Sequence, residues 1–394
     1  MTSRSVEDHA HAVRLLLDRA LAPATEHVPV PVALGRVLAA DVHAPIDLPL
    51  FRNSQMDGFA VAADSLRGVP VTLPIAATIA AGDAGPERLD PGTAVRIMTG
   101  APVPAGADCV VPVEDTDSDD DVVCVLVPRR RGEFVRDRGS DVHAGDVLLA
   151  AGTELTPRHL AMFAAVGLTA LPVRRRPRVA VIATGAELVP AGTALAPGQI
   201  YDSNSTALAA SVTANGGEVA FVDRSTDSPE LFRDMLARAT ESADVVLTSG
   251  GVSMGEFEVV REVLTPLGGW FGHVSMQPGG PQGLTEVGGV PVLSFPGNPV
   301  STLVSFEVFA RPELRRCAGL APLPADHAKL TGPLESPPGR RQFLRGRRVP
   351  QGVTLESGPG SHLVAALARA DVLIDIPEDV TTMQAGDDVR VWQL

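Results

Sequence analysis

Three short stretches rich in glycine and hydroxyl-bearing residues carry the groups best suited to chemistry. They are ATGAEL at 183–188, TSGGVSMGE at 248–256 and FPGNPVS at 295–301. Each follows an apolar run typical of a buried strand and precedes a segment with helical spacing. Glycine lets the backbone approach a ligand closely, and the unpaired N–H groups at the start of a helix suit anions. The three stretches therefore predict a cradle for a phosphate or another oxyanion.

Carboxylates accompany these stretches. Glu187 lies in the first, Glu256 and Glu258 lie at the end of the second, and Asp227 stands between a predicted strand and a helix. A carboxylate beside a polyanion is unfavourable unless a divalent cation joins them, and Mg²⁺ typically binds few carboxylates together with phosphate oxygens and water. The alternative is that the acids interact only with helix N-termini, and for Asp227 alone this alternative is favoured.

The composition excludes several classes of protein. The 394 residues carry a formal net charge of −14, which argues against a general nucleic-acid binder. No apolar run reaches the roughly 18 residues that span a bilayer, and the acids and histidines near the N-terminus do not suit a signal peptide. Cys109, Cys124 and Cys317 form no CxxC pair. We therefore expect a cytoplasmic protein without a membrane or nucleic-acid partner.

The order of predicted elements indicates how the loops are positioned. Residues 69–149 contain short apolar strands separated by glycine, proline and aspartate, which favours a small β-barrel or sandwich. From residue 178 strands alternate with helices, which predicts a parallel sheet with right-handed crossovers. Short strands return after about residue 323. Because parallel strands end at one edge of their sheet, the three glycine-rich stretches should meet there.

Eight stretches, in order along almost the whole chain, carry a resemblance to one family. They are NSQMDGFAV, IMTGAPVPAGAD, VRDRGSDVHAGDVLL, VAVIATGAEL, LTSGGVSMGE, FPGNPVS, RQFLRGR and GSHLVAALARADVLIDIPE. Together they resemble the molybdopterin molybdenumtransferases, the family of the MoeA protein and of the E domains of gephyrin and its plant counterpart. Eight motifs in the same order are far more specific than any single glycine-rich loop.

The resemblance implies a multidomain α/β plus β fold, in an elongated subunit of four domains. Residues 1–45 with 145–176 would form a discontinuous N-terminal domain, and 46–144 an inserted β-lobe. Residues 177–322 would form a molybdopterin-binding α/β domain with a parallel sheet, similar to molybdopterin adenylyltransferases, and 323–394 a C-terminal β-barrel. The family also implies a homodimer whose active site is shared between subunits, and a transient contact with molybdopterin adenylyltransferase.

The reaction implied by the resemblance is the insertion of molybdate into adenylylated molybdopterin. It is Mg²⁺-dependent, releases AMP and forms molybdenum cofactor. Phosphoanhydride cleavage requires a metal that neutralises charge and a water oriented by a carboxylate. Molybdate is a tetrahedral dianion, so it requires N–H donors, hydroxyls and fixed cations.

Individual roles follow from the matching motifs. The resemblance implies these catalytic groups: Asp57, Thr99 and Asp141, which face the partner subunit's pocket, and Glu187. It implies these Mg²⁺ ligands: Glu187, Asp227 and Glu258, with Glu256 nearby. It implies these groups at the terminal phosphate or pterin: Ser249, Gly250, Gly251 and Ser253. It implies these groups at the molybdate end: Pro296, Gly297, Asn298, Pro299, Ser301, Arg345 and Ser361.

The sequence departs from the family pattern in one loop. HVSMQPGGPQG places His273, Gln277 and Gly280 where the family usually carries lysines, and Glu258 stands where it usually carries aspartate. Loss of positive charge weakens capture of a polyanionic substrate. Two alternatives to the transferase therefore stay open. One is a catalytically weakened paralogue that binds molybdopterin or a partner protein without inserting metal, and the other is an adenylyltransferase acting on molybdopterin.

Overall fold

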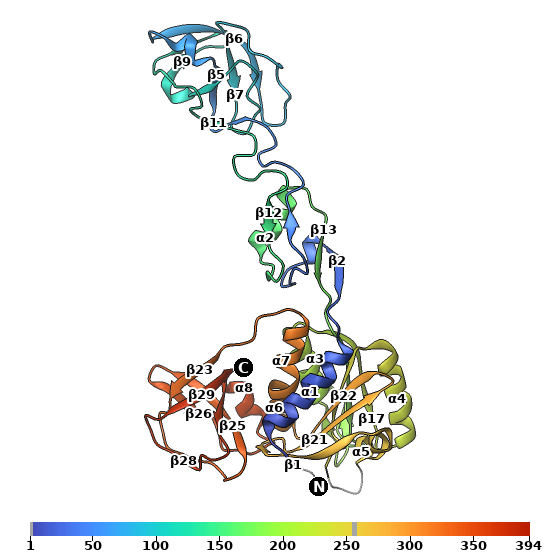
Figure 1. Cartoon of the computed structure of the whole chain (residues 1–394). Helices are drawn as coiled ribbons and strands as arrows, with labels where there is room; N and C mark the ends of the chain where they lie inside the picture. Colours follow the sequence, from blue (N-terminus) through green and yellow to red (C-terminus); the bar gives the residue numbers. More distant parts are fainter. Residues whose placement is uncertain (1–2, 254–257) are drawn as a thin grey trace. The chain divides into compact units, whose positions relative to one another are not determined.

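The computed structural model describes residues 3–253 and 258–394 (Figure 1). Contacts divide the chain into two compact units: unit 1 combines Met1–Glu26 with Val173–Leu394, and unit 2 is His27–Pro172. The chain passes between them through two paired strands, β2 (Thr25–Pro29) and β13 (Ala170–Arg174). Unit 2 is thus an insertion into unit 1. In the described residues no helix is long and apolar enough to cross a membrane.

The central sheet of unit 1 has the strand order β1-β19-β21-β22-β18-β14-β17. The bounds are β1 Ser3–Arg4, β14 Arg178–Thr184, β17 Glu218–Ser225, β18 Val245–Ser249, β19 Trp270–Val274, β21 Pro281–Val287 and β22 Val290–Phe295. Strands β17, β14, β18 and β22 are parallel, as predicted. Strand β21 is instead antiparallel to both β22 and β19, so the sheet is mixed. The cause is local, because Gly288 and Gly289 join β21 to β22 with φ of +58° and +85°, as a tight hairpin requires.

Helices cover both faces of this sheet. On one face lie α1 (Val6–Ala20), α3 (Asn204–Ala214) and α6 (Pro299–Ser305), and on the other lie α4 (Pro229–Ser242) and α5 (Val259–Leu264) (Figure 1). Successive side chains of β14 alternate between the two faces of the sheet, as a strand buried on both faces requires. Val179 and Val181 pack into the first layer, and Ala180 and Ile182 pack into the second. A π-helix (Phe306–Ala310) and α7 (Arg311–Cys317) continue α6.

A second sheet forms the C-terminal part of unit 1, with the order β20-β25-β27-β29-β23 and β26 paired to β25. Its bounds are β20 Met276–Gln277, β23 Ala325–Lys329, β25 Arg341–Val349, β26 Gly352–Leu355, β27 Val372–Ile376 and β29 Asp388–Gln393. Helix α8 (Val364–Arg369) precedes β27, and β24 (Leu334–Glu335) pairs with β28 (Thr382–Met383). Because β20 comes from the segment between β19 and β21, the C-terminal sheet is tied directly to the central one.

Unit 2 is built on a six-stranded sheet of order β8-β5-β7-β6-β10-β9. The bounds are β5 Gly58–Val61, β6 Val71–Ile79, β7 Ala94–Ile97, β8 Cys109–Pro112, β9 Thr116–Ser118 and β10 Val122–Val125. Short pairs join β3 (Val42–His43) to β12 (Val147–Leu149), and β4 (Asn53–Ser54) to β11 (Val135–Arg136). Helix α2 spans Pro157–Ala165.

The predicted fold class, a multidomain chain that joins an α/β fold to β-domains, is confirmed. One grouping differs from the predicted boundaries. Helix α1 was expected with 145–176, but Val13 and Leu17 pack into the core beneath the central sheet. The apolar spacing identified this helix correctly, yet spacing alone does not show which core the helix covers. The division into four domains stays a prediction.

Candidate functional site

The three glycine-rich loops meet at one edge of the central sheet. Strand β14 ends at Thr184, β18 at Ser249 and β22 at Phe295. The residues that follow line a single cavity of about 540 Å³, a size typical of small-molecule sites. The predicted site residues in its wall are Glu187, Asp227, Ser249, Gly250, Gly251, Ser253, Glu258, Pro296, Gly297, Asn298, Pro299 and Ser301. The prediction that the loops share one edge is confirmed.

A buried hydrogen-bond network joins the loops beneath the cavity. Asn204, at the start of α3, donates from Nδ2 to Ser249 Oγ at 2.9 Å and to the Gly297 carbonyl at 2.8 Å. Thr302 donates from Oγ1 to the Pro296 carbonyl at 2.6 Å, and its hydroxyl lies 3.1 Å from Ser249 Oγ. The sequence alone did not single out Asn204, which immediately precedes a predicted helix, or Thr302, which lies inside one.

Glycine is required where two loops touch the central strands. Gly250 has a φ of +95°, and a Cβ atom there would lie 2.6 Å from the Thr184 carbonyl oxygen. Gly251 has a φ of +66°. A Cβ atom at Gly297 would lie 3.4 Å from Gly250 Cα, so the second and third loops approach each other backbone to backbone. The floor of the cavity is therefore peptide groups and hydroxyls rather than long side chains.

Four carboxylates line the cavity but do not converge: Asp202 and the three predicted ligands Glu187, Asp227 and Glu258. Asp227 Oδ2 accepts a hydrogen bond from the Ala186 amide at 3.4 Å, and Glu258 Oε2 accepts one from the Ser253 amide at 2.8 Å. Across residues 3–253 and 258–394 no group of three or more His, Cys, Asp or Glu is arranged to hold a metal ion. Mg²⁺ needs only one or two protein carboxylates when phosphate oxygens and water complete its shell. The donors at the cavity fit that requirement, and Glu256 lies outside the described residues.

The predicted catalytic residues of unit 2 lie on its turns. Thr99 donates to Asp57 Oδ1 from its backbone amide at 2.6 Å and from its hydroxyl at 2.8 Å. These bonds, the backbone one first, hold the pKa of Asp57 below its usual value. Asp141 lies on a different turn, where its amide donates to the Leu48 carbonyl at 3.0 Å. The structure therefore brings Asp57 and Thr99 together.

Arg345 is fully buried and does not line the cavity. Its Nη2 donates to the carbonyls of Gly358 and Gly360. Within the described part of the chain, its buried Nε and Nη1 atoms have no hydrogen-bond partner. Burial lowers the pKa of its guanidinium. The Ser361 carbonyl in turn accepts a hydrogen bond from Val300 at 3.1 Å, so this segment contacts the first turn of α6.

The loop without lysines is packed with neutral groups. Gln277 Oε1 accepts a hydrogen bond from Gln342 Nε2 at 2.8 Å. A Cβ atom at Gly280 would lie 2.4 Å from Nε2 of His273. Burial, and then the nearby Arg340, lower the pKa of His273, so its ring is neutral at pH 7. The His273 ring thus occupies the space that a side chain at position 280 would need.

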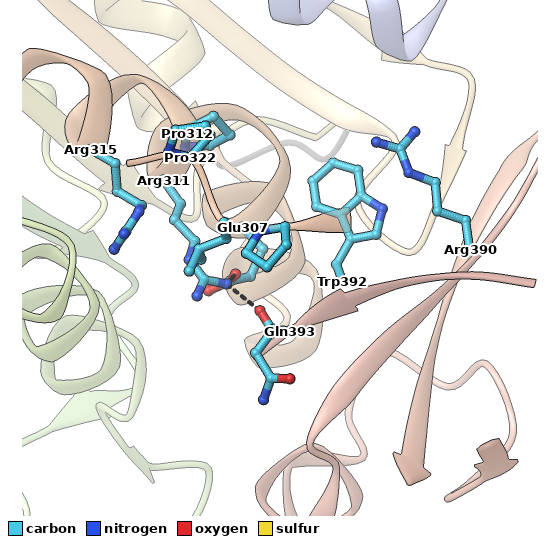
Figure 2. Close-up of a pocket in the computed structure, with 10 residues that line it drawn as sticks. Glu307, Arg311, Pro312, Arg315, Pro322, Arg390, Trp392 and Gln393 are labelled. Carbon is cyan, nitrogen blue, oxygen red and sulfur yellow. Dashed lines mark hydrogen bonds and ion pairs between the residues drawn. The ribbon is translucent and has the colours of Figure 1, made fainter. Parts of the chain in front are cut away.

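A second cavity of about 220 Å³ lies between α7 and β29 (Figure 2). Although arginines line it, their donors already bind groups of the chain. Arg311 pairs with Glu307 and donates to the Gln393 carbonyl at 2.7 Å (Figure 2). Arg315 donates to the Ala321 carbonyl at 2.8 Å. Trp392 and prolines supply much of the remaining wall. This cavity is therefore less suited to a polyanion than the cavity at the sheet edge.

Comparison with known families covers nearly the whole chain. Residues 4–167 match the MoeA N-terminal region (domain I and II), 180–316 match a probable molybdopterin binding domain, and 327–394 match the MoeA C-terminal region (domain IV). The chain belongs to the MoeA family of molybdopterin molybdenumtransferases. The predicted family is confirmed.

Curated and solved MoeA-family proteins match over most or all of their length. The chain is 47% identical to molybdopterin molybdenumtransferase 2 of Mycobacterium tuberculosis, over 99% of the chain and 100% of that protein. It is 37% identical to the molybdopterin molybdenumtransferase of Nostoc, over 94% of the chain and 89% of that protein. The crystal structure of a MoeA protein from Pyrococcus horikoshii matches 100% of the chain and 99% of its own, at 32% identity and a TM-score of 0.83.

Proposed function

We propose that this chain inserts molybdate into adenylylated molybdopterin, releases AMP and forms molybdenum cofactor. The observation that carries the proposal is the cavity at the sheet edge of a MoeA-family chain. Its floor of glycine amides and hydroxyls suits phosphate and molybdate oxygens, which need N–H and O–H donors. Its volume of about 540 Å³ suits a ligand larger than a free oxyanion.

Each set of residues has a distinct part in this proposal. Ser249, Gly250, Gly251 and Ser253 bind the terminal phosphate or the pterin, and the 296–301 loop binds molybdate. Glu187, Asp227 and Glu258 hold Mg²⁺, which neutralises charge on the phosphoanhydride as it breaks. Arg345 acts beneath the 357–361 segment rather than in the cavity wall.

We further propose that the chain acts as a homodimer of four-domain subunits in the cytoplasm. Unit 2 of one subunit would bring Asp57, Thr99 and Asp141 to the cavity of the other. Two exposed apolar side chains support such an interface: Phe51, close in sequence to Asp57, and Met98, next to Thr99. The three free cysteines support a reducing compartment. A transient contact with molybdopterin adenylyltransferase would deliver the adenylylated substrate.

The weakened paralogue is the second candidate, because a specific observation favours it. His273, Gln277 and Gly280 place neutral groups in a loop adjoining Pro281, which lines the cavity. Such a chain would bind molybdopterin or its adenylylated form and release no AMP. The adenylyltransferase alternative has no comparable observation in its favour.

The deciding experiment measures AMP release from adenylylated molybdopterin by the purified chain, with and without Mg²⁺ and molybdate. Release that depends on both supports the transferase, whereas tight binding without release supports the paralogue. Asp57→Asn and Glu187→Gln should abolish release without unfolding the protein, because exposed loop carboxylates contribute little to stability. Glu241→Gln, on the exposed face of α4, is the control. Full activity of both site variants would contradict the assigned roles.

A further inference from the structure

Three apolar side chains form a shelf in the wall of the cavity. Strand β15 (Leu188–Val189) pairs in parallel with β16 (Ile200–Tyr201), and Leu188, Ile200 and Tyr201 all line the cavity. Ile200 is 54% exposed and Tyr201 is 45% exposed. Most of the surrounding wall is glycine, hydroxyl, proline and carboxylate. Large apolar side chains exposed at a polar cavity mark a contact for an apolar part of a ligand.

The Tyr201 ring is held in place without a ligand. Its hydroxyl donates a hydrogen bond to the Thr193 carbonyl at 2.9 Å, across the segment that joins the two short strands. A side chain fixed in this way loses little conformational entropy when a ligand packs on it. Tyr201 is also the single tyrosine among the 394 residues.

The shelf is connected to the polar floor by a short stretch of backbone. Three residues after Tyr201, Asn204 donates to Ser249 Oγ and to the Gly297 carbonyl. Between them, Asp202 Oδ1 accepts a hydrogen bond from the Ser205 amide at 3.0 Å, which fixes the turn into α3. The ring and the phosphate-binding floor are thus held at a set separation. A ligand that fills both must join a flat apolar group to an oxyanion.

We infer that Tyr201 is a stacking platform for the planar heterocycle of the substrate, whose phosphate lies on the cavity floor. Adenine and pterin both present the flat π-face that an aromatic side chain stacks on, and such stacking is tolerant of the ring's identity. This inference rests on the proposed function for the identity of the stacked heterocycle, because an adenylylated pterin contains both an adenine ring and a pterin ring. The role is binding and orientation, not proton transfer.

The test uses the full chain labelled with 3-fluorotyrosine, which gives a single ¹⁹F resonance. AMP, ribose 5-phosphate and a soluble pterin are titrated in turn. A saturable shift with AMP but not with ribose 5-phosphate assigns the shelf to adenine, and a shift with the pterin alone assigns it to the pterin. No shift with any of the three would overturn the inference.

Affinity measurements on variants separate the ring from its hydroxyl. Calorimetry should show that Tyr201→Ala binds the ligand that shifts the resonance about 5- to 150-fold more weakly, the range for loss of one stacked base. Tyr201→Phe should stay within about threefold because it keeps the ring. Leu195→Ala, an exposed residue of the same segment outside the cavity wall, is the control. Equal losses in Tyr201→Phe and Tyr201→Ala would overturn the inference, because the hydroxyl and not the ring would then carry binding.

Binding is measured without turnover, so the two proposals can fail separately. If AMP or the pterin binds with the expected variant pattern while the wild-type chain releases no AMP from adenylylated molybdopterin, the transferase proposal fails and the stacking role stands. If AMP release is normal in both the wild-type chain and Tyr201→Ala, with an unchanged KM, the stacking role fails and the transferase proposal stands.

Discussion

Thr99 binds one carboxylate oxygen of Asp57 with two of its own groups, the backbone amide at 2.6 Å and the hydroxyl at 2.8 Å. Both bonds favour the ionised carboxylate, so the pKa of Asp57 lies below its usual value. By favouring the ionised form, these two bonds stabilise the folded state. This stabilisation is complete above the pKa of Asp57 in the unfolded chain, and it is lost as pH falls through its lower pKa in the folded chain. Asp57 is therefore charged throughout the neutral range and presents a fixed acceptor.

Thr99→Val tests this arrangement. The substitution removes the hydroxyl bond and keeps the backbone bond, so the pKa of Asp57 should rise but stay below its usual value. A carboxyl NMR titration of both proteins measures the change. AMP release should fall while the unfolding midpoint changes little. Thr93→Val, which removes a hydroxyl bonded to the Asp90 carbonyl, should leave the Asp57 pKa unchanged. An unaltered titration in Thr99→Val would contradict the assignment.

Gly280→Lys should destabilise the chain when introduced alone. The new Cβ atom would lie 2.4 Å from His273 Nε2, and overpacking of this kind typically costs about 1–3 kcal/mol. The double variant His273→Lys, Gly280→Lys removes the clash and adds two positive charges beside Pro281. Its urea midpoint should recover, and its KM for adenylylated molybdopterin should fall at low salt. Equal stability of the single and double variants would show that the two positions are independent.

Arg345→Met should loosen the 357–361 segment. The variant leaves the carbonyls of Gly358 and Gly360 without their buried donor, at a cost of about 1–3 kcal/mol. Hydrogen exchange should quicken at Val300, whose amide binds the Ser361 carbonyl, and the molybdate concentration for half-maximal activity should rise. Arg347→Met is the matched control, because that side chain is 57% exposed on the same strand. Unchanged exchange at Val300 would argue that Arg345 does not support this segment.

Gly250→Ala should be much more damaging than Gly297→Ala. At Gly250 the φ of +95° and the 2.6 Å approach to the Thr184 carbonyl both exclude a side chain, and backbone strain of this kind costs about 1–3 kcal/mol. At Gly297 the nearest atom to a new Cβ would be 3.4 Å away. Thermal unfolding and AMP release measured on both variants test the difference. Similar losses in the two variants would mean that close packing, rather than backbone conformation, determines the cost of a side chain at this edge.

The loops at the sheet edge could be predicted because each follows a buried apolar strand, a local signal that needs no tertiary information. The network beneath them could not, because Asn204 and Thr302 resemble ordinary helix residues until the fold brings Ser249 and Gly297 to them. Arg345 was expected at the molybdate end of the site. Its complete burial was not foreseeable, since arginine is rarely buried.

The antiparallel half of the central sheet illustrates another limit. Alternation of strands and helices indicated a parallel sheet, and it correctly described β14, β17, β18 and β22. The VGGV sequence at 287–290 carried a hairpin signal, and that signal determines the direction of β21. The assigned roles of the site residues stay predictions until the variants are measured.

The two chain crossings between the units have a consequence for how the protein can be cut and rebuilt. In unit 1 the Arg175 amide bonds the Ala24 carbonyl at 2.8 Å, and in unit 2 the Val30 amide bonds the Thr169 carbonyl at 3.0 Å. The ends of the insertion are therefore adjacent, and after a protease nicks one crossing the other crossing still joins unit 2 covalently to unit 1. The same adjacency makes the inserted unit an exchangeable cassette: a short peptide could replace residues 27–172 and leave the α/β scaffold continuous.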